Sequence, residues 1–146
     1  MNADHMLKQI TLQYIATGFD CYRKLADYVQ NGCRGHLDLA DTPVASLPDG
    51  LHVSGYLDLS NTPITSLPDG LHVGGYLSLA YTSITSLPDE LHVGSSLNLM
   101  NTSIASLPDG LHVGGDMYLR NTLISKKHTS EQLEKMLPNV RGAVVV

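Results

Sequence analysis

Hydrophobic and polar positions in the middle of the chain recur every twenty residues, without insertion or deletion, from about residue 36 to residue 124. One copy, residues 56–75, reads YLDLSNTPITSLPDGLHVGG. The first apolar column contains Leu37, Leu57, Leu77, Leu97 and Met117, and the second contains Leu39, Leu59, Leu79, Leu99 and Leu119. A fixed period of this length predicts a solenoid, because one unit cannot bury its apolar side chains alone and must stack on its neighbours.

The pattern inside each repeat predicts extended rather than helical chain. Residues 57–59 alternate apolar and polar, which is typical of a strand with one buried face. Leu67 precedes a proline, which disfavours the helical region for Leu67, so the return path should also be extended. Residues 71–73 alternate again and predict a second short extended segment. The Gly74–Gly75 pair is then interpreted as the turn into the next strand.

The first 34 residues carry helical periodicity in two stretches. The apolar positions are Leu7, Ile10 and Tyr14 in the first, and Tyr22, Leu25, Ala26 and Val29 in the second. We expect Asp4 and Asp20 to cap the two helices, Gly18 to end the first, and Asn31-Gly32 to end the second. One longer helix that bends at Gly18 fits the pattern equally well. Either arrangement would cover the open end of the first repeat, which a solenoid needs for solubility.

The last residues predict a second cap. Thr129 or Ser130, followed by residues 131–137, predicts a short capped helix that Pro138 stops, and residues 141–146 predict a final strand. The expected organisation is one compact domain with a helical N-terminal cap over residues 1–34, five 20-residue repeats over residues 35–125, and a C-terminal cap over residues 126–146.

The motif Leu-x-Leu-x-x-(Asn/Thr)-x-Ile-Thr-Ser-Leu-Pro-x-x-Leu resembles the short bacterial type of leucine-rich repeat. It is similar to the repeats of secreted bacterial effectors and of repeat proteins in bacterial and phage genomes, and it covers about ninety of the 146 residues. The resemblance implies a curved solenoid with a parallel β-sheet on the concave face and an extended, non-helical convex side. The effectors that ubiquitinate host proteins carry a separate catalytic domain that these residues do not contain, so that activity is not implied.

The chain departs from the family pattern in one column. The family usually has an Asn there, whose side chain forms a ladder to the neighbouring backbone. This chain has Thr42, Thr62, Thr82, Thr102 and Thr122 instead. Because a Thr hydroxyl can both donate and accept a hydrogen bond, the resemblance implies a Thr ladder.

Composition and charge narrow the function classes. A net charge of −5 with scattered Lys and Arg argues against direct binding of nucleic acid. Cys21 and Cys33 precede the repeats and show no metal-ligand spacing, so two free thiols in a reduced compartment are preferred to a disulfide. No apolar run approaches the length of a membrane span, and the first residues do not read as a secretory signal. We therefore expect a cytoplasmic protein that does not bind membranes.

Two constant polar columns could be mistaken for functional sites but are interpreted as parts of the structural scaffold. They are His52, His72, His92 and His112, and Asp49, Asp69, Asp89 and Asp109. The His column could bind a transition metal, but no orienting partners are identifiable, so no metal is expected. Below about pH 6 it should charge and lower stability. The Asp column follows Pro in turns, and Glu90 replaces Gly in one of them, which suggests that this position does not require a positive φ.

Catalytic constellations are not indicated. The Ser and His residues lie in regular ladders rather than converging in a pocket, and the Gly pairs are not followed by a helix that could hold a phosphate. No cofactor and no enzymatic activity are expected.

The outward positions of the first strand of each repeat differ between copies, while the core positions are nearly constant. The residues just after these strands, Asp41, Asn61, Tyr81, Asn101 and Asn121, are counted among them. Such a contrast is typical of a recognition surface on a solenoid. The side chains expected to bind a partner are Tyr56, Tyr76, Tyr81, Tyr118, Asp38, Asp58, Asp116, Arg120, Asn98 and Met100.

The sequence therefore predicts a non-enzymatic module that binds a protein partner through a Tyr-rich, acidic concave face. A bacterial or phage inhibitor or effector that masks a basic surface is one specific form of this hypothesis. The alternative is a structural or self-assembling solenoid, in which residues 141–146 add a strand to another copy. A monomer is expected under the first hypothesis and self-association under the second.

Overall fold

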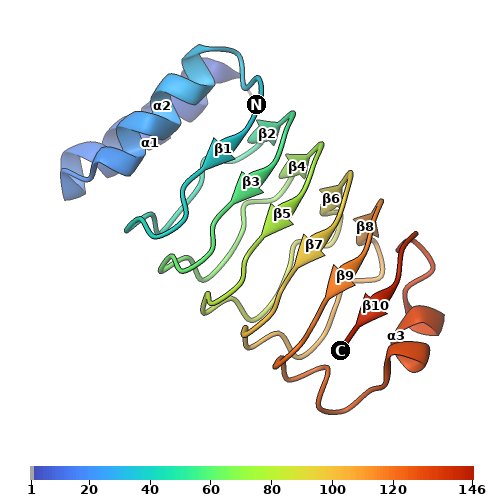
Figure 1. Cartoon of the computed structure of the whole chain (residues 1–146). Coiled ribbons are helices and arrows are strands. Elements are labelled where there is room, and N and C mark those ends of the chain that lie inside the picture. Colours follow the sequence, from blue (N-terminus) through green and yellow to red (C-terminus); the bar gives the residue numbers. More distant parts are fainter. Residues whose placement is uncertain (1) are drawn as a thin grey trace.

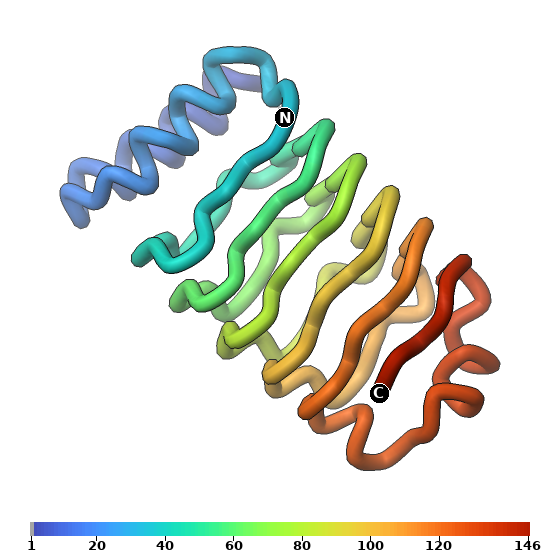
Figure 2. The backbone as a smooth tube through the Cα atoms, in the orientation of Figure 1, coloured from blue at the N-terminus to red at the C-terminus, as the bar shows by residue number. Residues whose placement is uncertain are grey.

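Each repeat of the computed structural model, which describes residues 2–146, contributes two short strands to two parallel sheets. The turns of chain stack along one axis, with two helices at the N-terminal end and a short helix and strand at the C-terminal end (Figure 1). The backbone trace shows successive repeats following nearly the same path (Figure 2). The predicted repeat solenoid with an extended return path is confirmed.

The larger sheet has six strands, all parallel, in the order β1-β3-β5-β7-β9-β10. Its strands are β1 (Leu37–Asp38), β3 (Leu57–Asp58), β5 (Leu77–Ser78), β7 (Leu97–Asn98), β9 (Met117–Tyr118) and β10 (Val144–Val145). The register pairs residues that are twenty positions apart, such as Leu37 with Leu57, so each buried column runs straight through the molecule. The last strand, β10, comes from outside the repeats and pairs with β9.

The smaller sheet has four parallel strands in the order β2-β4-β6-β8. They are β2 (His52–Val53), β4 (His72–Val73), β6 (His92–Val93) and β8 (His112–Val113), which confirms the predicted second extended segment. The inward positions of one repeat are all buried: Leu57, Leu59, Ile64, Leu67, Leu71 and Val73. These side chains join one continuous core with both caps.

The N-terminal cap consists of two helices, α1 (Ala3–Thr17) and α2 (Asp20–Gln30), rather than one bent helix. Gly18 lies between them in the left-handed conformation. The predicted caps are wrong by one or two residues. The Asn2 side chain, not Asp4, accepts the capping hydrogen bond, and Phe19 precedes α2 without any side-chain cap while Asp20 is already helical. An Asn immediately before the first helical turn can reach the free amides there, whereas Asp4 already lies inside it.

The N-terminal cap covers the first repeat, as predicted. Ile10 of α1 and Tyr22 of α2 are both buried, at 2% and 1% exposure. The Tyr22 hydroxyl also accepts a hydrogen bond from the Ala45 amide at 3.1 Å. The outer side of α1 keeps Leu12 and Ile15 exposed. The cap is thus joined to the solenoid by both apolar packing and a partly buried hydrogen bond.

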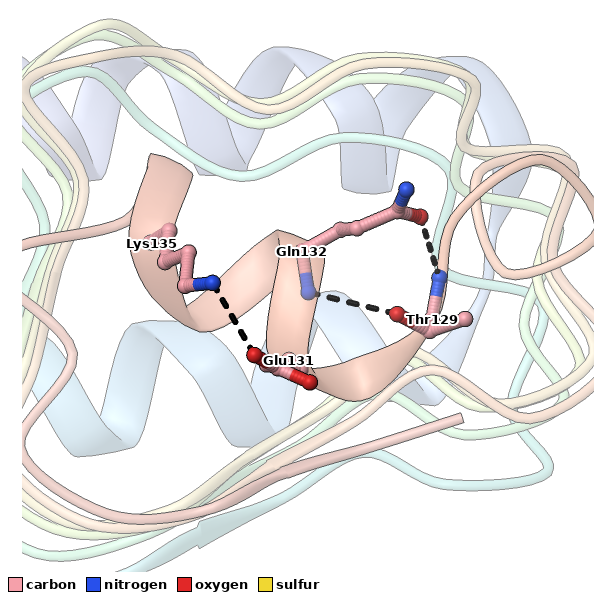
Figure 3. Close-up of polar contacts among 4 residues, drawn as sticks. All are labelled: Thr129, Glu131, Gln132 and Lys135. Carbon is pink, nitrogen blue, oxygen red and sulfur yellow. Dashed lines mark hydrogen bonds and ion pairs between the residues drawn. The ribbon is translucent and has the colours of Figure 1, made fainter.

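The C-terminal cap contains the predicted helix, α3 (Ser130–Met136), and the predicted strand, β10. Thr129 and Gln132 form a capping box, in which each side chain bonds the other residue's backbone amide (Figure 3). Lys135 pairs with Glu131 at 2.9 Å one turn away, also in Figure 3, but both side chains are at least 75% exposed, so this pair contributes little.

The Thr column does not form the ladder between repeats that the resemblance implies. Each hydroxyl donates to the carbonyl of the Leu three residues earlier in its own repeat, as from Thr102 to Leu99 at 2.7 Å. The other pairs are Thr42 with Leu39, Thr62 with Leu59, Thr82 with Leu79, and Thr122 with Leu119. A Thr side chain is one bond shorter in reach than Asn, so it closes the local turn instead of crossing to the next repeat.

The glycines serve two different purposes. At Gly74, Gly94 and Gly114 an added Cβ would collide with the carbonyl oxygen of the residue twenty positions earlier, so close stacking, and not only the turn, requires glycine there. At the Pro-Asp-Gly turns, Gly50 and Gly70 have φ of 72° and 75°, whereas Glu90 and Gly110 lie outside the positive-φ region. The prediction that this position needs no positive φ is therefore wrong for the first two repeats.

Replacing Gly94 with Ala should lower the free energy of unfolding by about 1–3 kcal/mol, because the new methyl group meets a backbone oxygen that cannot move without breaking the sheet. Urea unfolding followed by circular dichroism measures the change. Ser95→Ala, an exposed substitution at the next residue, is the matched control and should leave stability nearly unchanged. Equal stability of both variants would contradict the close-approach explanation.

Candidate interaction surface

The ten side chains expected to bind a partner all lie in, or directly beside, the strands of the six-stranded sheet. Tyr56, Tyr76 and Asp116 precede strands, Asp38, Asp58, Asn98 and Tyr118 lie within them, and Met100, Arg120 and Tyr81 follow them. The fold therefore brings residues from all five repeats onto one face, which we call the variable face. What each side chain does within the molecule differs strongly.

Tyr56 and Tyr76 each have a partner within 4.2 Å on the variable face itself. The His36 ring stacks on Tyr56 with ring centroids 4.2 Å apart and an angle of 14° between the planes. His36 Nδ1 accepts a hydrogen bond from the Tyr56 amide at 3.0 Å, which leaves the proton of the neutral ring on Nε2. The Tyr76 hydroxyl accepts from Asn98 Nδ2 at 3.1 Å. These contacts hold both rings in place before any partner binds.

Three of the predicted polar residues also fix the backbone after their strands. The Oδ1 atoms of Asp38, Asp58 and Asn98 accept from the amide two residues ahead, at 3.0, 2.9 and 3.0 Å. This is the local turn that Asp and Asn side chains commonly form. These residues therefore have a structural role that the sequence interpretation, which assigned them to binding, did not identify.

Asp116 joins the C-terminal cap to the last repeat. Its Oδ1 accepts from the Ala143 amide at 2.9 Å, directly before β10. Its Oδ2 lies 3.5 Å from the Tyr118 hydroxyl, which donates a long hydrogen bond. The proximity of residues 116 and 143 depends on how the C-terminal segment returns to the sheet, and no sequence signal indicated it.

The column that follows each strand is explained by backbone conformation. Asp41, Asn61, Tyr81, Asn101 and Asn121 all have φ between 55° and 61°, in the left-handed region. Asp and Asn tolerate this region better than other non-glycine residues. Side-chain bonds also link neighbouring copies, from Asn61 to Asp41 at 2.6 Å and from Asn121 to Asn101 at 3.0 Å. The four Asp and Asn residues of this column therefore have a structural role that the sequence interpretation did not identify.

Tyr81 is the exception in this column. It has a left-handed φ of 58°, which is unusual for a bulky residue, and 64% of it is exposed. Within residues 2–146 its hydroxyl makes no hydrogen bond. The side-chain hydrogen bonds that link neighbouring copies of this column, Asn61 to Asp41 and Asn121 to Asn101, are interrupted at Tyr81. The repeated Asp or Asn at the other four copies is the sequence signal that could have singled out Tyr81.

The repeats carry an unbalanced negative charge. From residue 35 to residue 119 the sequence contains nine Asp and Glu and no Lys or Arg. Arg120 is exposed at the far end of the variable face. Over the described part of the chain the single ion pair is the one between Lys135 and Glu131 on α3. The acidic side chains of the variable face are therefore not neutralised within the molecule.

The His column forms a continuous stack on the four-stranded sheet. Ring centroids are 4.3 Å apart between His52 and His72, 4.4 Å between His72 and His92, and 5.9 Å between His92 and His112. Parallel rings direct their nitrogen lone pairs in parallel, so the rings do not converge on a common ion. In residues 2–146, no group of three or more His, Cys, Asp or Glu side chains is arranged to hold a metal.

One ring of the stack, His72, and the two thiols have shifted pKa values. Burial lowers the pKa of His72 below its ordinary value, and charge on His52 and His92 lowers it further. Burial raises the pKa of the Cys21 and Cys33 thiols, which keeps both in the protonated, less nucleophilic form at neutral pH.

Comparison with known proteins assigns no family, because neither a family model nor a curated protein matches this chain. None of the helices within residues 2–146 is long and apolar enough to cross a membrane. The geometry of the variable face is therefore the main basis for a functional interpretation.

Lowering the pH from about 7.5 to about 5.5 should destabilise the fold. His72 takes up a proton at lower pH in the folded state than in the unfolded chain, so the stabilisation is complete above about pH 6.5 and is lost as pH falls toward the folded pKa. Urea unfolding at each pH measures the loss. His72→Gln should reduce this pH dependence, and an equal loss in the variant would contradict a role of the stack.

Proposed function

We propose that this protein is a non-enzymatic interaction module that binds a protein partner through the variable face. The observation that carries the proposal is the contrast between the two sides of the same strands. The buried positions repeat almost unchanged, whereas the outward positions differ from copy to copy and include four of the seven tyrosines of the chain. A purely structural array has no need for such individuality, while solenoids that recognise partners have variable faces.

The chemistry of the variable face favours a partner with a basic surface. Exposed and half-buried tyrosines supply large amphipathic contacts, and tyrosine is enriched at binding hot spots. The unneutralised carboxylates of the repeats would attract Lys and Arg and speed the encounter. An inhibitor or effector of bacterial or phage origin that masks a basic surface in the cytoplasm fits this chemistry and the resemblance of the repeat motif.

The polar columns give no support to catalysis. Side chains of one type stack along the solenoid at a spacing of about 4.8 Å, so each row presents one kind of group. Catalysis requires several such groups to converge on one reacting atom. The larger hollows between repeats lie beside the Pro-Asp turns and are open grooves, such as the one of about 310 Å³ lined by Ser46, Asp49, Ser66 and Asp69.

Replacing Tyr56, Tyr76 and Tyr118 together with Ala should weaken capture of the partner from the source cell by more than about tenfold, because hot-spot aromatics each contribute strongly. Affinity capture followed by mass spectrometry identifies the partner, and calorimetry with the purified partner gives the affinity. Affinity should also fall as salt rises.

Thr65→Ala with Thr85→Ala is the matched control, because both residues are exposed but lie outside the six-stranded sheet. Circular dichroism of each variant verifies folding. A folded triple variant that binds its partner as tightly as the control would contradict the proposal.

Self-assembly through the C-terminal strand has weaker support. The Val144 amide on the outer edge of β10 is not free to donate to an incoming strand, because it already donates to Glu134 Oε1 at 3.2 Å. Natural proteins protect sheet edges by covering them in this way. Light scattering over a concentration series should therefore report a constant monomer mass. The self-assembling alternative would be favoured if the mass rose with concentration and the Val144→Pro substitution abolished this rise.

A further inference from the structure

We infer that Tyr81 is the anchor residue of the variable face, and that its phenol ring enters an apolar pocket, rimmed by Lys or Arg, on the partner protein. This inference rests on the proposed function and adds which side chain dominates binding and what shape the partner must have.

The backbone at residue 81 prefers another side chain. Residues 41, 61, 101 and 121, which occupy the same place in the other repeats, are Asp or Asn, and all share the left-handed φ. A bulky side chain in this region crowds the following carbonyl, which destabilises the folded state. The turn therefore forms with Tyr81 at a local cost that the other repeats avoid.

A second loss occurs through the side-chain contacts between copies. Asn61 donates to Asp41, and Asn121 donates to Asn101, so the amide column is continuous on either side of Tyr81 but not across it. An Asn at position 81 would lie between two amides at the same spacing and could bond both. Folding alone thus favours Asn at this position for two independent reasons.

The Tyr81 ring gains little from its own molecule in return. It is 64% exposed, whereas Ala80, the residue before it, is buried. The other tyrosines of the variable face differ, because Tyr56 stacks on His36, Tyr76 bonds Asn98, and Tyr118 bonds Asp116. Tyr81 is the one whose ring projects without such a contact among the residues described.

These observations define what would stabilise Tyr81. A projecting ring loses water contact only if a partner surrounds it, so the partner must present a concave apolar pocket. The phenol hydroxyl needs a hydrogen-bonding group inside that pocket. Because the repeats around it carry acidic and no basic side chains before Arg120, the rim of the pocket is complementary if it carries Lys or Arg.

The test compares four variants with the wild-type chain. The probe is a set of peptides selected from a random dodecapeptide library on the immobilised wild-type protein. Tyr81→Asn should raise the midpoint of urea unfolding by about 0.5 M. It should also lower the affinity for the selected peptides by at least about 30-fold. Tyr81→Phe keeps the ring, so it should retain most of the affinity for the peptides. Its midpoint of urea unfolding should equal that of the wild-type chain. Selected peptides should be rich in Lys or Arg together with apolar residues.

Asn101→Tyr is the matched control for the conformational step, since it places the same ring on the same backbone one repeat further on. It should lower the unfolding midpoint by a similar amount. If Tyr81→Asn does not raise the midpoint, or Asn101→Tyr does not lower it, position 81 carries no cost and the inference is overturned.

The failure of the anchor can be distinguished from the failure of the proposed function. If the variant with Ala at Tyr56, Tyr76 and Tyr118 no longer binds the peptides while Tyr81→Asn still binds them, the variable face binds but Tyr81 is not its anchor. If neither variant loses them, the peptides bind elsewhere and both conclusions fail. Loss in both variants, with greater stability in Tyr81→Asn alone, is the expected result.

Discussion

Backbone hydrogen bonds between successive turns of chain hold the solenoid together and align residues that are twenty positions apart. In the larger sheet an amide such as that of Leu57 donates to Tyr76 O of the next repeat at 2.9 Å, and in the smaller sheet Gly74 donates to Val53 O of the previous one at 2.7 Å. Turns of equal length keep both sheets in register without any distortion of the connecting loops. A single residue inserted within a strand would reverse which of the following side chains face the core.

The register also places similar side chains of successive repeats on top of one another. The chemistry of each column decides whether this stacking is favourable. Leu on Leu fills the core, and Asn on Asp or Asn forms short amide contacts. Neutral imidazoles stack well, but the same geometry brings charges together once they are protonated. Glycine is required where backbones of successive turns approach most closely, as at Gly94. Constant columns are therefore products of stacking, and a break in a column needs another explanation.

The ends of the stack lack this support and are completed by residues outside the repeats. Helices α1 and α2 cover the first turn with buried side chains such as Ile10 and Tyr22. At the other end, β10 adds a sixth strand, and Asp116 and Glu134 bond the backbone that leads into it. Both caps close the core, so the variable face remains as the broad surface on which the copies differ and Tyr81 as the position where a column is broken.

Much of the fold follows from the sequence alone, because alternation and a constant period report which side chains are buried. The two extended segments, the non-helical return path at Leu67 and the position of α3 were all predictable in this way. Hydrogen-bond partners and backbone angles were not, because they depend on whether a group three residues away or one twenty residues away is nearer. Only the tertiary structure decided that Thr102 bonds within its own turn, that Asp116 holds residue 143, and that Tyr81 occupies a left-handed position that suits Asn.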